Sequence, residues 1–414
     1  MKRWIEKEFK WENKDPRLGK RLNQLATQLY KGIGKPIPMA CKGWANTKAA
    51  YRFLSNIKVT DEQVLSGHLK ATQKRVAQWE GKILVLHDTT EYSYKRKRPS
   101  KIGQIREVVF NYDRKYTVCG LLMHSSIVTT SDGLPLGLAA IKFWTRGIFN
   151  RPRSVRNKTN PTRIPIETKE SYRWIENLRQ STELLNDPNR CIHIGDRECD
   201  IFEFFSEAIK IKTQFLVRVC VNRRTEDGEK MYEMTDNRSS QGTHAIIYYR
   251  DGKQITATLE VRFCKMRVSP PTDKRKKYSP IDAWMVSGKE CVSTAKTTDK
   301  PLHWRLLTTL PINTPEDAKE ALALYAQRWK IETWHKVIKS GCKAEESKLR
   351  SAENLTKLIS IFCVLSWRIL WLTMLNRSAP DSDPSLVLSK NEQKILDRLI
   401  PDKKKLSDLY CPPI

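Results

Sequence analysis

Acidic residues are scarce in this chain of 414 residues. Only 46 aspartates and glutamates oppose 75 lysines and arginines, which gives a formal net charge of +29. Solubility alone requires far less charge than this. The imbalance predicts a polyanionic partner, with nucleic acid first and an anionic membrane surface second. A hydrophobic fraction of 39% with 12 tryptophans excludes wholesale disorder, and the length suits two or three domains.

Paired cysteines and a leader sequence are also lacking. The ten cysteines are scattered and contain no C-x-x-C pair, which argues against a structural zinc site. Scattered thiols in a chain of this length fit a reducing cytosol. Residues 1–7 contain no apolar stretch, so we expect no signal peptide and a cytoplasmic protein.

Long hydrophobic runs are rare. Residues 358–375 form the one stretch that is nearly long and apolar enough to span a membrane. This stretch is slightly short for a comfortable span, and Arg368 lies in its second half. Without a second such segment, we predict a buried core helix and no membrane partner. The chain also has no internal repeat and no low-complexity tract.

The first 70 residues have a helical pattern. Asp15 and Pro16 form a helix start, and leucines then recur at helical spacing from Leu18 to Leu29. A Gly/Pro-rich break over residues 32–38 precedes a second helical stretch at 47–54. One basic face of this unit could contact phosphates, but a solvated surface would have the same composition.

A different pattern begins at residue 82. Residues 82–88 and 191–196 are apolar strand-like runs, each ending in an acid, Asp88 or Asp196. Runs at 116–130 and 133–144 predict a hairpin, 170–185 a helix and 215–221 another strand. In residues 222–303 apolar and polar side chains alternate as in β-strands, and residues 274–277 are basic. This pattern predicts an inserted β subdomain with a basic tip. Another strand is predicted at 304–310. Basic loops are expected at 95–98 and 146–163.

A long helix is predicted after Pro315, and its polar residues share one face. At about 100° per residue, the four residues concerned fall within an arc of about 60°: Tyr325, Arg328, Glu332 and Lys339. The opposite side is apolar. A solvated surface face would carry similar charges, so this pattern alone does not identify a site.

The three acids together favour metal chemistry. Two carboxylates at strand ends and one on a helix supply the oxygen ligands that hard divalent cations prefer. Two such metals about 3.5–4 Å apart stabilise the attacking and leaving oxygens in phosphoryl transfer. His87 and His124 are expected to be packed or orienting residues rather than ligands, and Glu198 and Asp200 to be helix-start acids.

The spacing Y-(2)-R-(3)-E-(6)-K in residues 325–339 resembles the signature of bacterial insertion-sequence transposases of the DDE type. The chain is similar to relatives of the cut-and-paste transposase of the kanamycin-resistance composite transposon. Blocks around Asp88, Asp196 and Arg218 match that family in the same order, as do DPRLGKR and AAYRF near the N-terminus. The similarity extends from about residue 8 to residue 376.

This resemblance implies an α/β protein with an RNase H-like catalytic core that a β-rich insertion divides between the second Asp and the Glu. The domains expected are a helical transposon-end-binding domain (1–70), the first part of the core (71–221), the insertion (222–303), the second part of the core with the Glu-bearing helix (304–376), and a short, apparently truncated C-terminal helical tail (377–414).

The resemblance also implies roles for individual residues. Asp88, Asp196 and Glu332 would be catalytic and would bind two Mg²⁺ ions, for which Mn²⁺ could substitute. Trp304 would stack on a flipped base, although a core aromatic at a strand start is the alternative. The other expected DNA contacts are Tyr325, Arg328, Trp329, Lys339 and Arg218 near the acids, and Arg17, Arg21, Lys35 and Arg52 in the end-binding domain.

The function implied is metal-dependent DNA cleavage and strand transfer by a homodimer that pairs two transposon ends. Water would cut one strand, the freed 3′-OH would form a hairpin with the opposite strand, and the reopened end would attack target DNA. Because relatives continue past residue 414, the alternative is a shortened, non-catalytic protein that inhibits transposition by binding DNA ends. A structure-specific nuclease with the same metal site is a further alternative.

Overall fold

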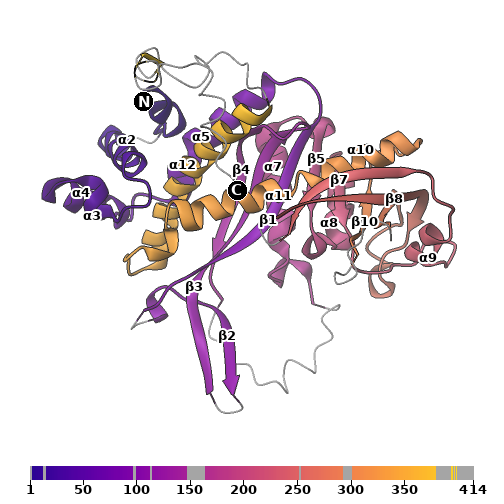
Figure 1. The fold of residues 1–414 in the computed structure, drawn as a ribbon. Helices are drawn as coiled ribbons and strands as arrows, with labels where there is room; N and C mark the ends of the chain where they lie inside the picture. Colours follow the sequence, from indigo (N-terminus) through magenta and orange to yellow (C-terminus); the bar gives the residue numbers. More distant parts are fainter. Residues whose placement is uncertain are drawn as a thin grey trace.

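The computed structural model describes residues 2–12, 15–96, 99–111, 114–146, 164–250, 253–291 and 301–378, with the isolated positions 393, 394, 396 and 398 (Figure 1). Most of the predicted basic loop at 146–163, the second half of the one at 95–98, and nearly all of the predicted C-terminal tail lie outside these residues.

Helices form the N-terminal part of the protein, as predicted. They are α1 (Lys2–Glu8), α2 (Pro16–Lys31), α3 (Ile37–Cys41), α4 (Trp44–Leu54) and α5 (Asp61–Ala77). The Asp15 side chain accepts a hydrogen bond from the Arg17 amide at the start of α2, and Pro16 occupies the first turn. Leu22, Leu25 and Leu29 are buried along one face of that helix, whereas Leu18 is only partly buried.

A ten-stranded mixed sheet runs through the rest of the molecule. Its main path is β2-β3-β1-β5-β6-β10-β9-β8-β7, and β4 pairs with β3. The strands are β1 (Ile83–Ser93), β2 (Gln104–Asn111), β3 (Arg114–Thr130), β4 (Pro135–Trp144), β5 (Cys191–Gly195), β6 (Gln214–Arg218), β7 (Thr243–Arg250), β8 (Lys253–Val268), β9 (Ile281–Glu290) and β10 (His303–Thr308). β1, β5 and β6 are parallel neighbours, and the other pairs are antiparallel.

Two features of the first strands differ from the sequence prediction. Asp88 is not at the end of its strand, because β1 continues to Ser93 and pairs with β3 over its whole length. The sequence analysis also missed β2, which pairs with the first part of β3 to form a ribbon that extends away from the body (Figure 1).

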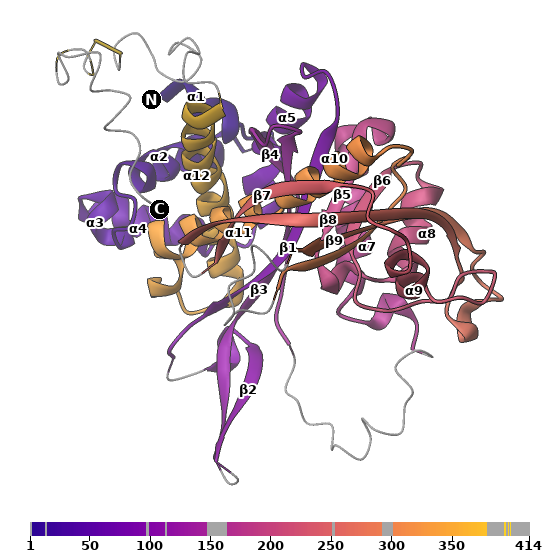
Figure 2. The same cartoon turned by 45° about the vertical axis from the view of Figure 1, so that its right-hand side comes forward.

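The predicted β insertion is present but is continuous with the central sheet. β7, β8 and β9 form an antiparallel meander, and β9 pairs with β10, which in turn pairs with β6 (Figure 2). The short helix α9 (Met231–Asp236) packs on β8 and β9. The insertion therefore widens the sheet at its far edge.

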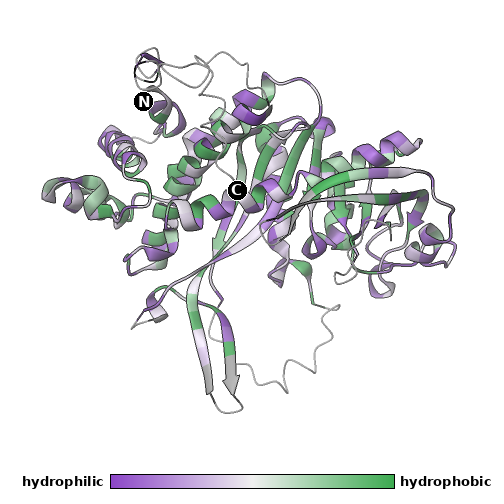
Figure 3. Cartoon of the chain, viewed as in Figure 1, coloured by the Kyte–Doolittle hydropathy of each residue, from purple (hydrophilic) through white to green (hydrophobic). Residues whose placement is uncertain are grey.

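Helices cover both ends of the sheet. α5, α7 (Tyr172–Leu185) and α12 (Ala352–Ser378) contact β4, whereas α10 (Pro315–Ala326) packs on β7, β8 and β9. α8 (Phe202–Lys210) packs against α7 and β6. Figure 3 shows the apolar residues concentrated where these helices face the strands.

The single long helix predicted after Pro315 is interrupted. α10 ends at Ala326, α11 covers Trp329–Lys336, and Val337–Gly341 form a π-helical turn. Hydrogen bonds of the tighter i to i+3 type connect residues 324–331, including Arg328 N–H to Tyr325 O at 3.0 Å. The predicted 60° arc assumes 3.6 residues per turn throughout, whereas this segment is irregular. Arg328 nevertheless contacts Glu332, as a shared face requires.

α12 contains the apolar stretch at residues 358–375. It is long and apolar enough to cross a membrane, but most of that stretch is buried inside the protein. The Arg368 guanidinium lies over the rings of Trp4 and Trp371, at 5.3 and 4.5 Å. The helix is thus part of the main hydrophobic core, as predicted.

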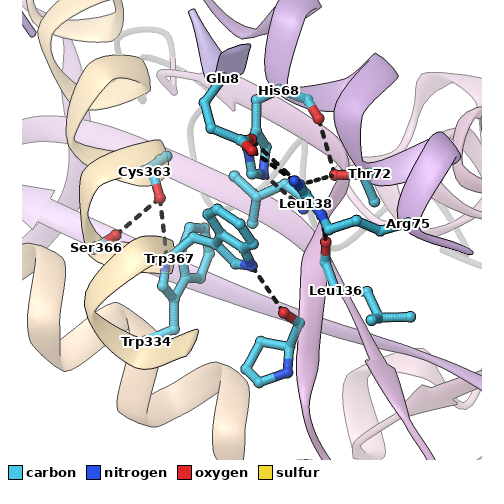
Figure 4. A network of polar contacts seen from close by, with 11 residues as sticks. Glu8, His68, Thr72, Arg75, Leu136, Leu138, Trp334, Cys363, Ser366 and Trp367 are labelled. Carbon is cyan, nitrogen blue, oxygen red and sulfur yellow. Dashed lines mark hydrogen bonds and ion pairs between the residues drawn. The ribbon is translucent and has the colours of Figure 1, made fainter. Parts of the chain in front are cut away.

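A buried polar network joins α1 and α5 to the sheet (Figure 4). Glu8 accepts hydrogen bonds from His68 Nδ1 at 2.5 Å and from Arg75 at 2.6 Å. The Leu138 amide donates to His68 Nε2 at 3.1 Å, so His68 is neutral and carries its proton on Nδ1. Arg75 also donates to Leu136 O and lies over the Trp367 ring. These contacts connect the N-terminal helices to β4 and α12.

The network makes stability dependent on pH. Burial alone would raise the pKa of Glu8, but the bonds from His68 and Arg75 lower it to about 2, against 4.5 for an ordinary glutamate. We expect Glu8→Gln to lower the free energy of unfolding by about 3 kcal/mol at pH 7 because Arg75 loses its buried partner. The difference from the wild type should shrink as the pH falls from about 4.5 towards 2, where the wild-type carboxylate becomes protonated.

Urea denaturation at several pH values measures this effect. Glu12→Gln is the matched control, since Glu12 also pairs with a cation of α5, the exposed Lys70. That variant should change stability by less than about 1 kcal/mol. Equal losses in the two variants would contradict a special role for the buried network.

Candidate active site

Two neighbouring parallel strands bring two of the predicted acids close together, Asp88 within β1 and Asp196 directly after β5. The register of β1 with β5 pairs Leu86 with Ile194, and extending it by two residues sets Asp88 beside Asp196. Adjacent strands are about 4.8 Å apart. Asp196 directly follows β5, as predicted, and its side chain accepts a hydrogen bond from the Glu198 amide at 2.9 Å.

The third acid is connected to this pair through an arginine. Arg328, which precedes α11, donates a hydrogen bond to the Glu332 carboxylate and lies 4.0 Å from Asp88 Oδ1. The Glu332 side chain is 53% exposed, whereas those of Arg328 and Asp88 are largely buried. Arg328 therefore neutralises part of the negative charge that gathers here.

The closeness of these charged groups shifts their pKa values. Burial raises the pKa of Asp196, and the neighbouring charge of Asp88 raises it further. Burial disfavours the charge on Arg328, but Tyr325, Glu332 and Asp88 together raise the pKa of its guanidinium. Arg328 remains a cation at any physiological pH.

The donor chemistry of the three acids fits a hard divalent cation, since all the ligands would be carboxylate oxygens. Burial is the main cause of the raised pKa of Asp196 and the charge of Asp88 adds to it, so a cation bound here would favour the ionised carboxylate. Among the described residues, however, no group of three His, Cys, Asp or Glu side chains is already placed to hold a metal ion. Glu332 is bound to Arg328 instead, so a three-carboxylate site requires that this ion pair open.

A small open cavity of about 320 Å³ lies over these residues. Its lining includes Asp88, Glu332, His335 and Lys339. The Lys339 ammonium also lies 5.8 Å from the centre of the Tyr92 ring. Arg328 and Lys339 thus place two cations next to the acids, as the sequence pattern predicts.

The sequence analysis missed His335, which contacts Asp88. Its Nδ1 lies 3.6 Å from Asp88 Oδ2, and its Nε2 is 2.9 Å from the Ser125 hydroxyl. Ser125 is the residue that β3 pairs directly with Asp88. His335 is buried and follows Glu332 by three residues on α11, a spacing that puts both on one face of the helix. The i to i+3 spacing from Glu332 is therefore the feature of the sequence that could have indicated His335 as a site residue.

Arg173 of α7 was also missed. It donates hydrogen bonds to the Thr89 hydroxyl at 3.1 Å and to Glu198 at 2.6 Å. Thr89 follows Asp88, and Glu198 comes two residues after Asp196. Arg173 therefore bridges the segments that carry the two aspartates.

Fully buried histidines lie behind the aspartates. His87 bonds to His193 at 2.8 Å and to the Ser126 hydroxyl at 2.9 Å, and His124 bonds to the Thr89 hydroxyl. Burial lowers the pKa of His87 to about 3 and that of His124 well below its ordinary value. Both are neutral packing residues, in agreement with the sequence analysis.

Two predicted DNA contacts are packed against each other. The rings of Trp304 and Tyr325 meet edge to face, with centroids 5.0 Å apart, and the residues are only 8% and 4% exposed. Arg218 donates a hydrogen bond to His303 O at 3.0 Å, next to Trp304. Trp329, at the start of α11, is partly exposed.

The predicted contacts of the N-terminal helices differ in exposure. Arg17, Lys35 and Arg52 are exposed, and Arg17 pairs with Asp15. Arg21 is partly buried and donates to Asn46 O at 2.6 Å, so it connects α2 to α4. Its guanidinium holds these helices together in the described structure.

Comparison with protein families gives two matches. Residues 1–59 match the family model described as Transposase DNA-binding, and residues 174–367 match the Transposase DDE domain. Asp196 and Glu332 fall within the second match, which implies an RNase H-like core, whereas Asp88 precedes it. Both the N-terminal helices and the second half of the sheet are therefore similar to transposase domains.

Proposed function

We propose that this protein is an insertion-sequence transposase that binds terminal inverted repeats and moves DNA by metal-dependent cut-and-paste chemistry. The observation that carries the proposal is the register of β1 with β5, which sets Asp88 beside Asp196, with Glu332 connected to Asp88 through Arg328. The relationship to transposases of the Y-(2)-R-(3)-E-(6)-K type rests on the residues from Tyr325 to Lys339.

Asp88, Asp196 and Glu332 would hold two Mg²⁺ ions, or Mn²⁺ in their place. When bound, the metals lower the pKa of the attacking water and stabilise the attacking and leaving oxygens. Arg328, once released from Glu332, would hold a phosphate near the cut, and Lys339 would contact the same backbone. His335 would donate its Nδ1 proton towards Asp88, accept a hydrogen bond from Ser125, and so orient the carboxylate.

DNA binding would use the exposed cations of the N-terminal helices for the transposon end. Trp304 could stack on a flipped base only after its contact with Tyr325 opens, because that contact covers its ring. Two copies pairing two ends in a synaptic complex would bring both cuts under common control. Such a protein would act in the bacterial cytoplasm, on the nucleoid.

One observation favours a second function. The acids are not gathered as a metal site in the described residues, and Glu332 is paired with Arg328. A protein that stays in this state would bind transposon ends without cutting them and would inhibit transposition. Metal-dependent cleavage separates the two functions.

Replacing single acids by their amides tests the catalytic assignment. Asp88→Asn, Asp196→Asn and Glu332→Gln should each lower Mg²⁺-dependent cleavage of the element's end DNA by about a thousandfold or more, because each removes a charged metal ligand. Binding of that DNA, measured by electrophoretic mobility shift, should persist. Glu320→Gln is the control, since Glu320 is a half-exposed acid paired with Lys82, which precedes β1, and this variant should cleave nearly normally.

The possible results separate the three functions. Full cleavage by Asp88→Asn would overturn the catalytic assignment. A wild type that binds ends but never cleaves with Mg²⁺ or Mn²⁺ would support the inhibitor. Cleavage without joining to target DNA would support a structure-specific nuclease.

His335 offers a separate test of how Asp88 is oriented. His335→Gln should raise the Mg²⁺ concentration needed for half-maximal cleavage by about tenfold, the usual effect of losing a residue that orients a metal ligand. His68→Gln is the control, because His68 is another buried histidine bound to a carboxylate, far from the acids. It should lower thermal stability without changing the Mg²⁺ requirement, and an equal shift in both variants would refute the positioning role.

A further inference from the structure

A cavity of about 910 Å³ lies between the DNA-binding domain and the DDE half of the chain. Four parts of the sequence line it: residues 34–38 with Tyr51, the end of β1 with the first part of β3, the segment 342–349 that follows the Glu332 helix, and α12. Pockets for small molecules or cofactors usually measure about 300–1,000 Å³. The space is large enough for one nucleotide.

The lining combines an apolar interior with a basic mouth. Leu349, Leu358 and Phe362 are buried side chains of the wall. Lys35, Lys95 and Lys348 also line the cavity; they are exposed and form no ion pair with any described residue. This arrangement suits a ligand with a flat apolar part and an anionic part.

Tyrosines supply the aromatic surface. Tyr51 and Tyr116 are 37% and 50% exposed and both line the cavity, one from α4 and one from β3. Aromatic side chains of this kind serve as stacking partners for bases in proteins that bind single strands. The N-terminal helices and the sheet thus each supply one aromatic ring.

The Tyr94 hydroxyl has no hydrogen-bond partner among the described residues. Tyr94 is only 4% exposed, lines the cavity, and has the Arg96 guanidinium 5.2 Å from its ring centre. Burial, with the nearby Glu345 carboxylate, raises the pKa of this phenol, which therefore keeps its proton. Buried hydroxyls are nearly always paired, so this one is available to bond to a ligand or to a water molecule.

The cavity is continuous with the strand that carries Asp88. Glu345 accepts hydrogen bonds from the Ser93 amide at 2.7 Å and from its hydroxyl at 3.0 Å. Ser93 is the last residue of β1 and lies five residues beyond Asp88, about 17 Å along an extended strand. Ser93 and Glu345 therefore connect the lining of the cavity to the strand that carries Asp88.

We propose that the cavity binds one unstacked nucleotide of the DNA substrate. The base would enter between Tyr51 and Tyr116 and bond to the Tyr94 hydroxyl, while Lys35, Lys95 and Lys348 contact the neighbouring phosphates. The site is separate from Trp304, which packs against Tyr325 beside β10. The inference rests on the proposed function only in requiring that the DNA run from the N-terminal domain to the acids.

Removal of a single oxygen atom tests the proposal. Two fluorescent duplexes of the same sequence are compared by anisotropy at fixed salt, one fully paired and one with a single unpaired base. Tyr94→Phe should weaken binding of the unpaired-base duplex by about three- to tenfold, the effect of one lost hydrogen bond, and leave the paired duplex unaffected. Because the hydroxyl has no protein partner, this variant should keep its thermal stability.

Tyr92→Phe is the matched control. Tyr92 is buried two residues away, and its hydroxyl contacts Met123 Sδ at 3.8 Å, outside the cavity lining. That variant should bind both duplexes as the wild type does. Tyr51→Ala should weaken the unpaired-base duplex by about tenfold through lost stacking. A 2-aminopurine at the unpaired position should lose fluorescence on binding wild type but not Tyr51→Ala.

Several results would overturn the proposal. One is that Tyr94→Phe binds the two duplexes with the wild-type ratio of affinities. Another is that lysine variants lower the affinity for both duplexes equally, while no tyrosine variant changes the ratio of the two affinities. That result would indicate that the cavity only contacts the phosphate backbone. If Asp88→Asn still cleaves DNA while Tyr94→Phe binds only the unpaired-base duplex more weakly, the proposed chemistry is wrong and the nucleotide site is supported. If Asp88→Asn is inactive while Tyr94→Phe binds both duplexes as the wild type does, the nucleotide site is wrong and the proposed chemistry is supported.

Discussion

The parallel pairing of β1 with β5 is the constraint on which the site depends. Because parallel strands in register keep equivalent residues adjacent, two carboxylates about a hundred residues apart in sequence must lie next to each other. Pairing of β1 with β3 then places Ser125 opposite Asp88, and His335 of α11 contacts both. The helix carrying Glu332 is thereby attached to the strand carrying Asp88.

The positive charge of Arg328 offsets part of the negative charge of the three acids. Burial raises the pKa of Asp196, the charge of Asp88 raises it further, and the Arg328 guanidinium offsets part of this effect. Arg328 directly precedes α11 and reaches Glu332 at the i to i+4 spacing of a helix. The segment that joins α10 to α11 therefore also sets the electrostatics of the site.

The features that could be predicted from the sequence are those that depend on residues close together in the chain. The strand before Asp196, the β3–β4 hairpin, the cap of α2 at Asp15 and the buried α12 were all accessible from periodicity and turn residues. The extension of β1 beyond Asp88, the pairing of β9 with β10, and the contacts of His335 and Arg173 depend on partners distant in sequence, which one sequence does not reveal. The break after Ala326 contains no Gly or Pro, so no helix-breaking residue in the sequence indicated it.

The contacts between the N-terminal helices and α12 have a consequence for the order of folding. Lys357 donates to Asn56 O across 301 positions of sequence, and Arg368 covers the Trp4 ring. The helices α1 to α5 are therefore synthesised about 300 residues before the part of α12 against which they pack. Their docking on α12 is a step of high contact order, and they remain without this support until α12 has been made.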